Sequence, residues 1–173
     1  MIVEDKLRSL GLALPDTERD YRANVSGARY VSHLAVGNVL YLSGTCPVKD
    51  GQPFRRGVVG ADLSLEEGYE AARYALLPAL GVIKYALGDL DRVQQAIQMI
   101  GFVNSAPGFT DQPRVINGAT DLLVELYGER GKPTRAAIGC QGLAIGHSVE
   151  VVLTVLFAGS EVRPPLHRDA HAR

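Results

Sequence analysis

A carboxylate stands out in the strongly apolar segment near the end of the chain. Glu150 lies in the run from Ser148 to Phe157, in which nearly all of the remaining residues are apolar. An ionised carboxylate in such a segment has to be solvated in a cleft, paired with a cation, or shifted in pKa. Two interpretations stay open here: Glu150 is a functional group in a cleft, or it lies near the solvated start of a strand.

An arginine precedes this carboxylate by fifteen positions, at the start of another apolar run. The planar guanidinium of Arg135 suits bidentate binding of a carboxylate or phosphate, although an ordinary surface arginine has the same sequence signature. An arginine that clamps a carboxylate, together with a glutamate that orients or deprotonates water, could hydrolyse a C=N or C=O bond. The sequence therefore suggests this chemistry without deciding on it.

Other catalytic chemistries find little support. The four histidines lack metal-ligand spacing, and there is no glycine-rich phosphate loop, so we predict neither a metal nor a cofactor. Cys46 and Cys140 are too few for a disulfide framework, and we interpret both as small apolar residues.

The composition excludes several classes of protein. The 173 residues fit one domain, and 18 basic against 19 acidic side chains give a net charge of −1, which does not favour binding to nucleic acid. The longest apolar runs are shorter than the ~20 residues that a membrane helix needs. The acidic start does not resemble a signal peptide, so we expect a cytoplasmic protein.

The hydrophobic patterns predict two main helices between single and paired strands. Ser64 and Glu67 form a capping box before an apolar stripe that runs to Gly88, with Pro78 expected to kink or split the helix. A second helix is predicted over 111–127. Strands are predicted over 29–36, 39–43, 93–103, 136–143 and 148–158.

This order predicts an α+β fold with a mixed β-sheet and both helices on one face. We expect an N-terminal extension over 1–26, with a short helix over 4–12 and a linker over 16–22, then a domain over 27–159 and a flexible C-terminal tail over 160–173. The last two strands are expected to form a hairpin, in which Arg135 faces Leu156, about 20 Å from Glu150 at ~3.3 Å per residue. The two could then meet only across a subunit interface.

Several segments together resemble the RidA/YjgF family, once called endoribonuclease L-PSP. They keep the family's order and span about residues 27–158, and they are Gly37–Pro47, Leu87–Val93, Gly101–Asn104, Val115–Gly118 and Arg135 with Val149–Glu150. The run from Phe102 to Pro113 is similar to a longer, less characterised branch of the family.

The resemblance implies a chorismate-mutase-like fold and a homotrimer with three clefts between subunits. In the deaminase members these clefts hydrolyse 2-imino acids to 2-keto acids and ammonia without a metal or cofactor. It implies that Arg135 binds the substrate carboxylate and Glu150 positions the water. It places substrate-binding residues at Tyr30, Ser43, Gly44, Asn117 and Ala137.

Two departures from the family pattern reshape the expected pocket. Ala144 stands where the family has proline, and Ala137 stands where the deaminase members have cysteine. We therefore expect either a hydrolase for a small imine or enamine that bears a carboxylate, or a non-catalytic trimer that binds a small carboxylate metabolite. A ribonuclease is disfavoured by the charge balance and by an aromatic content of 6%.

Overall fold

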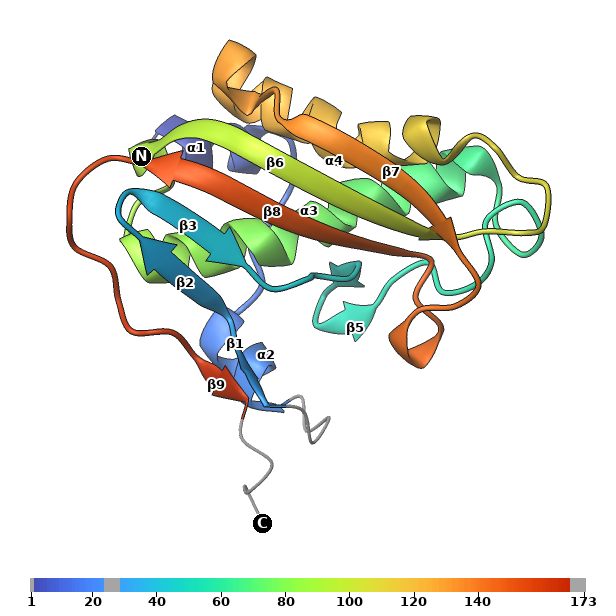
Figure 1. The fold of residues 1–173 in the computed structure, drawn as a ribbon, viewed down its shortest axis with the longest axis horizontal. Helices are drawn as coiled ribbons and strands as arrows, with labels where there is room; N and C mark the ends of the chain where they lie inside the picture. Colours follow the sequence, from blue (N-terminus) through green and yellow to red (C-terminus); the bar gives the residue numbers. More distant parts are fainter. Residues whose placement is uncertain (1, 24–28, 169–173) are drawn as a thin grey trace.

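A five-stranded mixed sheet forms the centre of the molecule (Figure 1). The computed structural model describes residues 2–23 and 29–168. In spatial order the strands are β2 (His33–Val36), β3 (Val39–Leu42), β8 (Val149–Phe157), β6 (Val93–Asn104) and β7 (Thr134–Cys140). Neighbours are antiparallel except β6 and β7, which are parallel. The predicted mixed sheet is confirmed.

Two helices cover one face of this sheet, as predicted (Figure 1). Helix α3 (Leu65–Leu87) begins with the expected capping box, in which Glu67 N donates to Ser64 Oγ and Glu67 Oε2 accepts from Ser64 N. Pro78 lies inside α3 without splitting it. Helix α4 (Gln112–Tyr127) packs closely on α3, because Gly118 leaves no side chain to collide with the carbonyl oxygen of Tyr69.

The hydrophobic core lies between the helices and the sheet. Alternate residues of β8 point into it, and these are at most 1% exposed: Val149, Val151, Leu153, Val155 and Phe157. The residues between them point to the opposite face. No helix of the described chain is long and apolar enough to cross a membrane.

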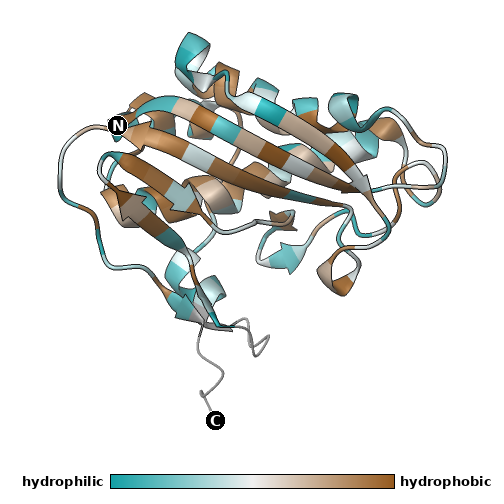
Figure 2. Ribbon diagram, viewed as in Figure 1, coloured by the Kyte–Doolittle hydropathy of each residue, from teal (hydrophilic) through white to brown (hydrophobic). Residues whose placement is uncertain are grey.

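Among the residues that the structure describes, no helix or strand covers the opposite face of the sheet (Figure 1), and the strands themselves are rich in apolar residues (Figure 2). Its strands expose four large apolar side chains by 43–65%: Leu34, Val36, Tyr41 and Ile138. Leu34, Val36 and Tyr41 lie together on the paired strands β2 and β3, and exposed apolar groups gathered in this way are typical of an interaction surface.

The expected hairpin of β7 and β8 is wrong, because β6 lies between these strands. Strands β6 and β7 are joined by α4, which is the crossover that parallel neighbours need. The connection from β7 to β8 holds the short 3₁₀ helix η3 (Ala144–Gly146), and it is long enough to pass over one strand.

Short elements complete the fold around the sheet. They are α1 (Ile2–Ser9), α2 (Thr17–Ala23), β1 (Tyr30–Val31), β4 (Val48–Lys49), β5 (Gln52–Pro53), the 3₁₀ helices η1 (Leu90–Arg92) and η2 (Gly128–Gly131), and β9 (His167–Arg168). Helix α1 fits the predicted short helix, and it packs on α4 and η1. The linker predicted over 16–22 is wrong, because α2 occupies most of it.

The described part of the C-terminal segment, residues 160–168, differs from its prediction as a flexible tail, and residues 169–173 of that predicted tail lie outside the described residues. Strand β9 pairs with β1, and Leu166 is buried. Ser32 binds the backbone of Leu166 in both directions: its N–H donates to the Leu166 carbonyl at 2.9 Å, and its Oγ accepts from Leu166 N at 3.0 Å. Residues 160–168 are therefore held against the body of the protein.

Candidate functional site

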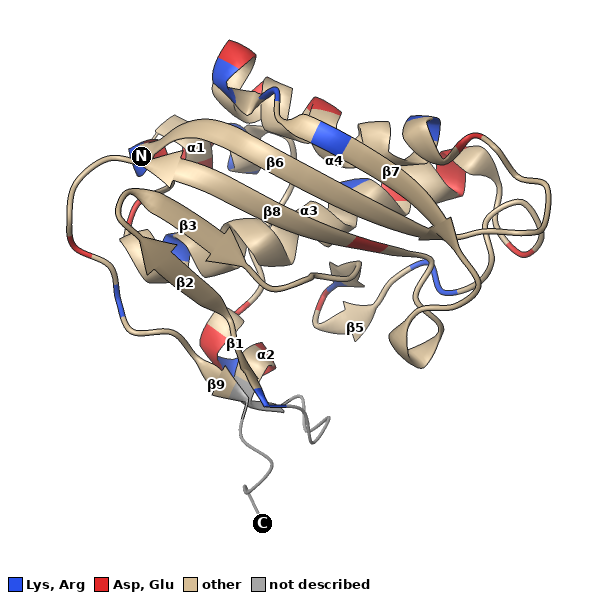
Figure 3. Cartoon of the chain, in the orientation of Figure 1, with Lys and Arg blue, Asp and Glu red and all other residues tan. Residues whose placement is uncertain are grey.

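Glu150 lies at the second position of β8, on the sheet face away from the helices. It is the one charged residue of β8, visible as the red segment of that strand in Figure 3. Its neighbour on β6 is Phe102. On the other side its carboxylate lies directly over Gly44, where a Cβ would overlap Glu150 Oε1. The carboxylate therefore fits between the strands only because position 44 has no side chain.

A cavity of about 510 Å³ surrounds this carboxylate. Glu150, Tyr30 and Gly44, three of the residues predicted to form the site, line it together. This volume lies within the range of small-molecule sites in proteins. The three residues thus border one space, and their roles in binding and catalysis stay predictions.

Ser43 has a different position from the one expected of a substrate-binding residue. Its hydroxyl donates to the carbonyl of Val31 at 2.6 Å, and its N–H donates to the carbonyl of Ser32 at 3.1 Å. Ser43 thus holds β1 against the end of β3. This contact positions Tyr30, the neighbour of Val31, at the cavity.

Arg135 lies on the edge strand β7 and reaches toward α4. Its Nη1 donates to Asn117 Oδ1 at 2.8 Å and to Thr120 Oγ1 at 3.0 Å. The structure therefore brings together Arg135 and Asn117, both predicted site residues, and adds Thr120, which the sequence did not indicate. Ala137, two residues further along β7, is half-buried.

Arg135 and Glu150 do not meet within one chain. Arg135 of β7 pairs with Met99 of β6, and Met99 pairs in turn with Leu153 of β8. Glu150 is three residues further along, two strands across and on the opposite face, so the two Cα atoms lie about 14 Å apart by strand geometry. Arg135 and Glu150 of one chain are thus far apart, as expected, but the reason is their positions two strands apart in the sheet and not the predicted hairpin.

Cys46 contacts the carboxylate, contrary to the interpretation of this cysteine as an ordinary apolar residue. Thr45 and Val151 form an antiparallel bridge, which places Cys46 opposite Glu150. The Cys46 thiol donates to Glu150 Oε2 at 3.8 Å. No pattern in the sequence pairs these segments, so the contact follows from the tertiary structure alone.

Helix α2 forms another wall of the cavity that the sequence did not indicate. Thr17, Asp20 and Tyr21 all line it. The ring of Tyr21 meets that of Tyr30 edge to face, with centroids 6.2 Å apart. The N-terminal extension therefore contributes to the same space as Glu150.

His147 and the η3 loop form the wall near β8. His147 is 5% exposed and lines the cavity, and its Nδ1 has no hydrogen-bond partner in the part of the chain that the structure describes. Burial, and then the charge of Arg56, lower the pKa of His147, so its imidazole is neutral at pH 7. Ile145, also at the cavity, has φ 49°, a region that β-branched residues rarely adopt.

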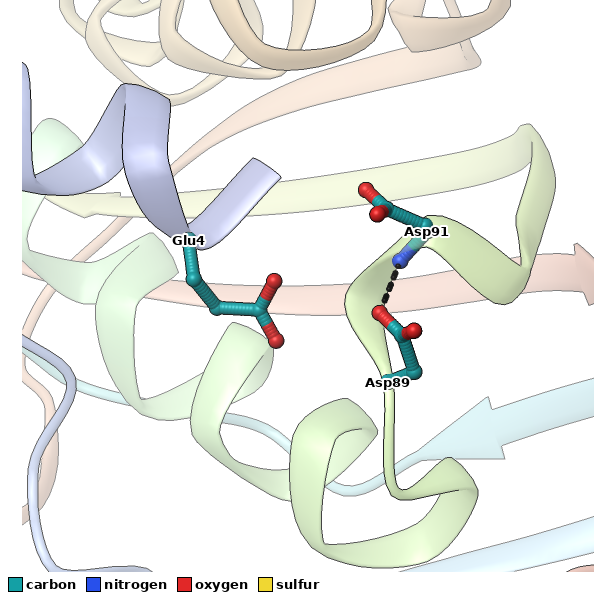
Figure 4. Close-up of side chains that lie close together, drawn as sticks. All are labelled: Glu4, Asp89 and Asp91. Atoms are coloured by element: carbon teal, nitrogen blue, oxygen red, sulfur yellow. Dashed lines mark hydrogen bonds between the residues drawn. The ribbon is translucent and has the colours of Figure 1, made fainter. Parts of the chain in front are cut away.

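A separate cluster of carboxylates lies at the start of α1. Glu4, Asp89 and Asp91 lie close together (Figure 4), each with an oxygen within 4.8 Å of the others. Asp91 accepts from the N–H groups of Ile2 and Val3 at 2.6 and 2.9 Å, and Lys84 Nζ lies 2.7 Å from Glu4 Oε1. Burial raises the pKa of Asp91, but these N–H bonds together with the charged amino terminus outweigh burial, so the pKa is lowered. The cluster anchors the first turn of α1.

Comparison with known proteins places the chain in a family. Residues 4–158 match the family described as "YjgF/chorismate mutase-like, putative endoribonuclease". The protein TCP17 of Trypanosoma cruzi is 39% identical over 150 residues, which cover 86% of this chain and 90% of that protein.

Two solved structures share the fold closely. A protein of unknown function from Agrobacterium tumefaciens is 36% identical with a TM-score of 0.81, covering 91% of this chain and 93% of its own. A protein from Shewanella oneidensis, described as an endoribonuclease by similarity, is 31% identical with a TM-score of 0.82, covering 91% of this chain and all of its own. The family match over nearly the whole chain, supported by these two structures, means that this chain belongs to the RidA/YjgF family.

Proposed function

We propose that this protein hydrolyses a small reactive imine that bears a carboxylate, giving a 2-keto acid and ammonia, in clefts between the subunits of a homotrimer. The observation that carries this proposal is the position of Glu150. Its carboxylate lies in a cavity of suitable size, beside a glycine backbone and a tyrosine. A half-buried carboxylate in such a space is suited to orient water.

The hydrolytic step needs only water and the imine. Glu150 accepts a proton from the water as its oxygen attacks the imine carbon, and the π electrons of the C=N bond move to nitrogen. The nitrogen takes this proton from Glu150, which gives the neutral carbinolamine. Glu150 then carries the hydroxyl proton of the carbinolamine to its nitrogen, the C–N bond breaks as C=O forms, and ammonia leaves. An imine is electrophilic already, so positioning of the water supplies much of the effect.

The substrate carboxylate needs a cation, and the described residues that line the cavity include no lysine or arginine. Arg135 suits this role because it is exposed, and within the described residues Asn117 and Thr120 engage only its Nη1. It is too far from Glu150 in the same chain. We therefore infer that Arg135 of one copy reaches the cavity of a neighbour, and the uncovered apolar sheet face supports such an assembly.

The proposal is tested with an amino-acid oxidase that generates 2-imino acids and semicarbazide that traps what remains. We expect the wild type to suppress the trapped product and both Arg135→Ala and Glu150→Ala to fail. An unchanged Glu150→Ala rate would refute the catalytic role. A binding function that needs Arg135 alone would appear as wild-type stabilisation by a small carboxylate, kept in Glu150→Ala and lost in Arg135→Ala.

A further inference from the structure

A second arginine, Arg56, lies beside the cavity wall formed by His147. The two residues form an isolated antiparallel bridge, and Gly57 N donates to the carbonyl of Gly146 at 3.0 Å. Directly opposed residues of an antiparallel pair point to the same side. Arg56 is not among the residues that line the cavity, but its side chain stands on the same side of this bridge as that of His147, which does line it.

The guanidinium of Arg56 lies against the η3 loop. A Cβ on Gly146 would be 3.4 Å from Arg56 Nη2 and 3.7 Å from its Nε. Gly146 stands between Ile145 and His147, which both line the cavity. The amide of Asn104 steadies this corner, since its Nδ2 lies 3.3 Å from the carbonyl of Gly57 and 3.4 Å from that of His147.

Arg56 differs from its neighbour in sequence in having no counter-ion. Arg55 binds Glu67 and Glu70 of α3, with N–O distances of 2.6 and 2.7 Å. Within the described chain, Arg56 makes no ion pair or side-chain hydrogen bond. An exposed guanidinium therefore lies against Gly146, beside the η3 wall of a cavity whose own charged groups, Glu150 and Asp20, are acidic.

We propose that Arg56 is a specificity-determining residue that binds a second acidic group on the substrate, so that the protein prefers imines of amino dicarboxylic acids. This inference rests on the proposed function for the reaction itself. In it, Arg135 of the partner subunit binds the carboxylate next to the imine, and Arg56 binds the carboxylate at the far end. The neutral imidazole of His147 offers a hydrogen bond beside Arg56 without repelling it.

Hydrolysis of two imines tests the specificity. One imine is generated from D-aspartate by D-aspartate oxidase, and the other from D-alanine by a D-amino-acid oxidase. The wild type should prefer the acidic imine. Arg56→Gln should lose about 10–100-fold in kcat/KM for the acidic imine, the range for hydrogen bonds to a charged group, and should act normally on the neutral one. Arg8→Gln, which removes an exposed arginine of α1, is the matched control and should change neither rate.

A binding measurement separates this inference from the reaction. Glutarate and butanoate, which cannot be hydrolysed, are titrated against the wild type, Arg56→Gln and Arg8→Gln by calorimetry. Tighter binding of glutarate that only Arg56→Gln abolishes supports the role of Arg56 even if no imine is hydrolysed. Equal loss for both ligands or both imines in Arg56→Gln, or a wild type without preference for the acidic compounds, would overturn it.

Discussion

Replacing Gly44 by alanine should disable the site while leaving the fold intact. The new Cβ would overlap Glu150 Oε1, so the carboxylate oxygen would have to retreat by well over 1 Å to reach the 3.4 Å of an ordinary contact. A misplacement of about 1 Å of a catalytic group costs about 100-fold in rate. We therefore expect kcat for imine hydrolysis to fall by about two orders of magnitude in Gly44→Ala.

The stability of this variant should change little. Gly44 has no positive φ, so alanine can adopt its backbone conformation without strain. Because alanine lowers the conformational entropy of the unfolded chain, the substitution by itself would stabilise the fold by about 0.4–1 kcal/mol. The displacement of the half-buried Glu150 side chain costs free energy and offsets this stabilisation. We expect the melting temperature of Gly44→Ala to stay within a few degrees of the wild type.

The semicarbazide assay measures the loss, and a second substitution tests its cause. Glu150→Asp shortens the side chain and removes the overlap, so Gly44→Ala should cost much less activity in the Glu150→Asp background than in the wild type. Wild-type activity in Gly44→Ala would refute the reasoning, because the carboxylate would then not need its present position. A crystal structure of the variant with Glu150 unmoved would refute it equally.

Two further predictions concern stability. Burial lowers the pKa of both His33 and His147 in the folded protein. Below the histidine pKa of the unfolded chain, about 6.5, the unfolded chain therefore binds more protons than the folded one. The free energy of unfolding then decreases as the pH is lowered, by at most ~1.4 kcal/mol per pH unit for each histidine. Urea unfolding between pH 7.5 and 5 should show this slope, and His147→Gln should reduce it; a slope that is unchanged in His147→Gln contradicts the assignment. Gly118→Ala should destabilise the fold by about 2–3 kcal/mol, because its Cβ collides with the Tyr69 carbonyl and forces α3 and α4 apart; urea unfolding with a midpoint at or above that of the wild type would show that the helices tolerate the methyl group.

The elements with strong local signals were predictable from the sequence. The capping box at Ser64 and the apolar stripe that follows it gave α3, and Gly88 marked its end. Helix α2 escaped prediction because its seven residues, Thr17–Ala23, are mostly charged or polar and have no apolar stripe. The burial of Leu166 escaped as well, because its partner Ser32 is far away in the sequence.

The site was predictable only where the family pattern covers it. Glu150 attracted attention because a carboxylate in an apolar strand needs an explanation. Cys46 reaches Glu150 only through the bridge of Thr45 and Val151, and His147 joins the cavity through the η3 loop. Such contacts depend on strand pairing, which sequence periodicity does not specify, as the wrong hairpin of β7 and β8 also shows.

Mixing two inactive variants tests most directly whether the site is shared between subunits. Arg135→Ala and Glu150→Ala chains are co-expressed in equal amounts. Half of the clefts then receive an intact Arg135 from a Glu150→Ala chain, and half of those clefts also receive an intact Glu150 from an Arg135→Ala chain. About one quarter of the wild-type activity should return in a randomly mixed closed trimer. As a control, the wild type mixed equally with the double variant Arg135→Ala/Glu150→Ala should show about one quarter of full activity for a shared site and about half for a site within one chain. A mixture of the single variants that stays as inactive as either alone would contradict the shared site.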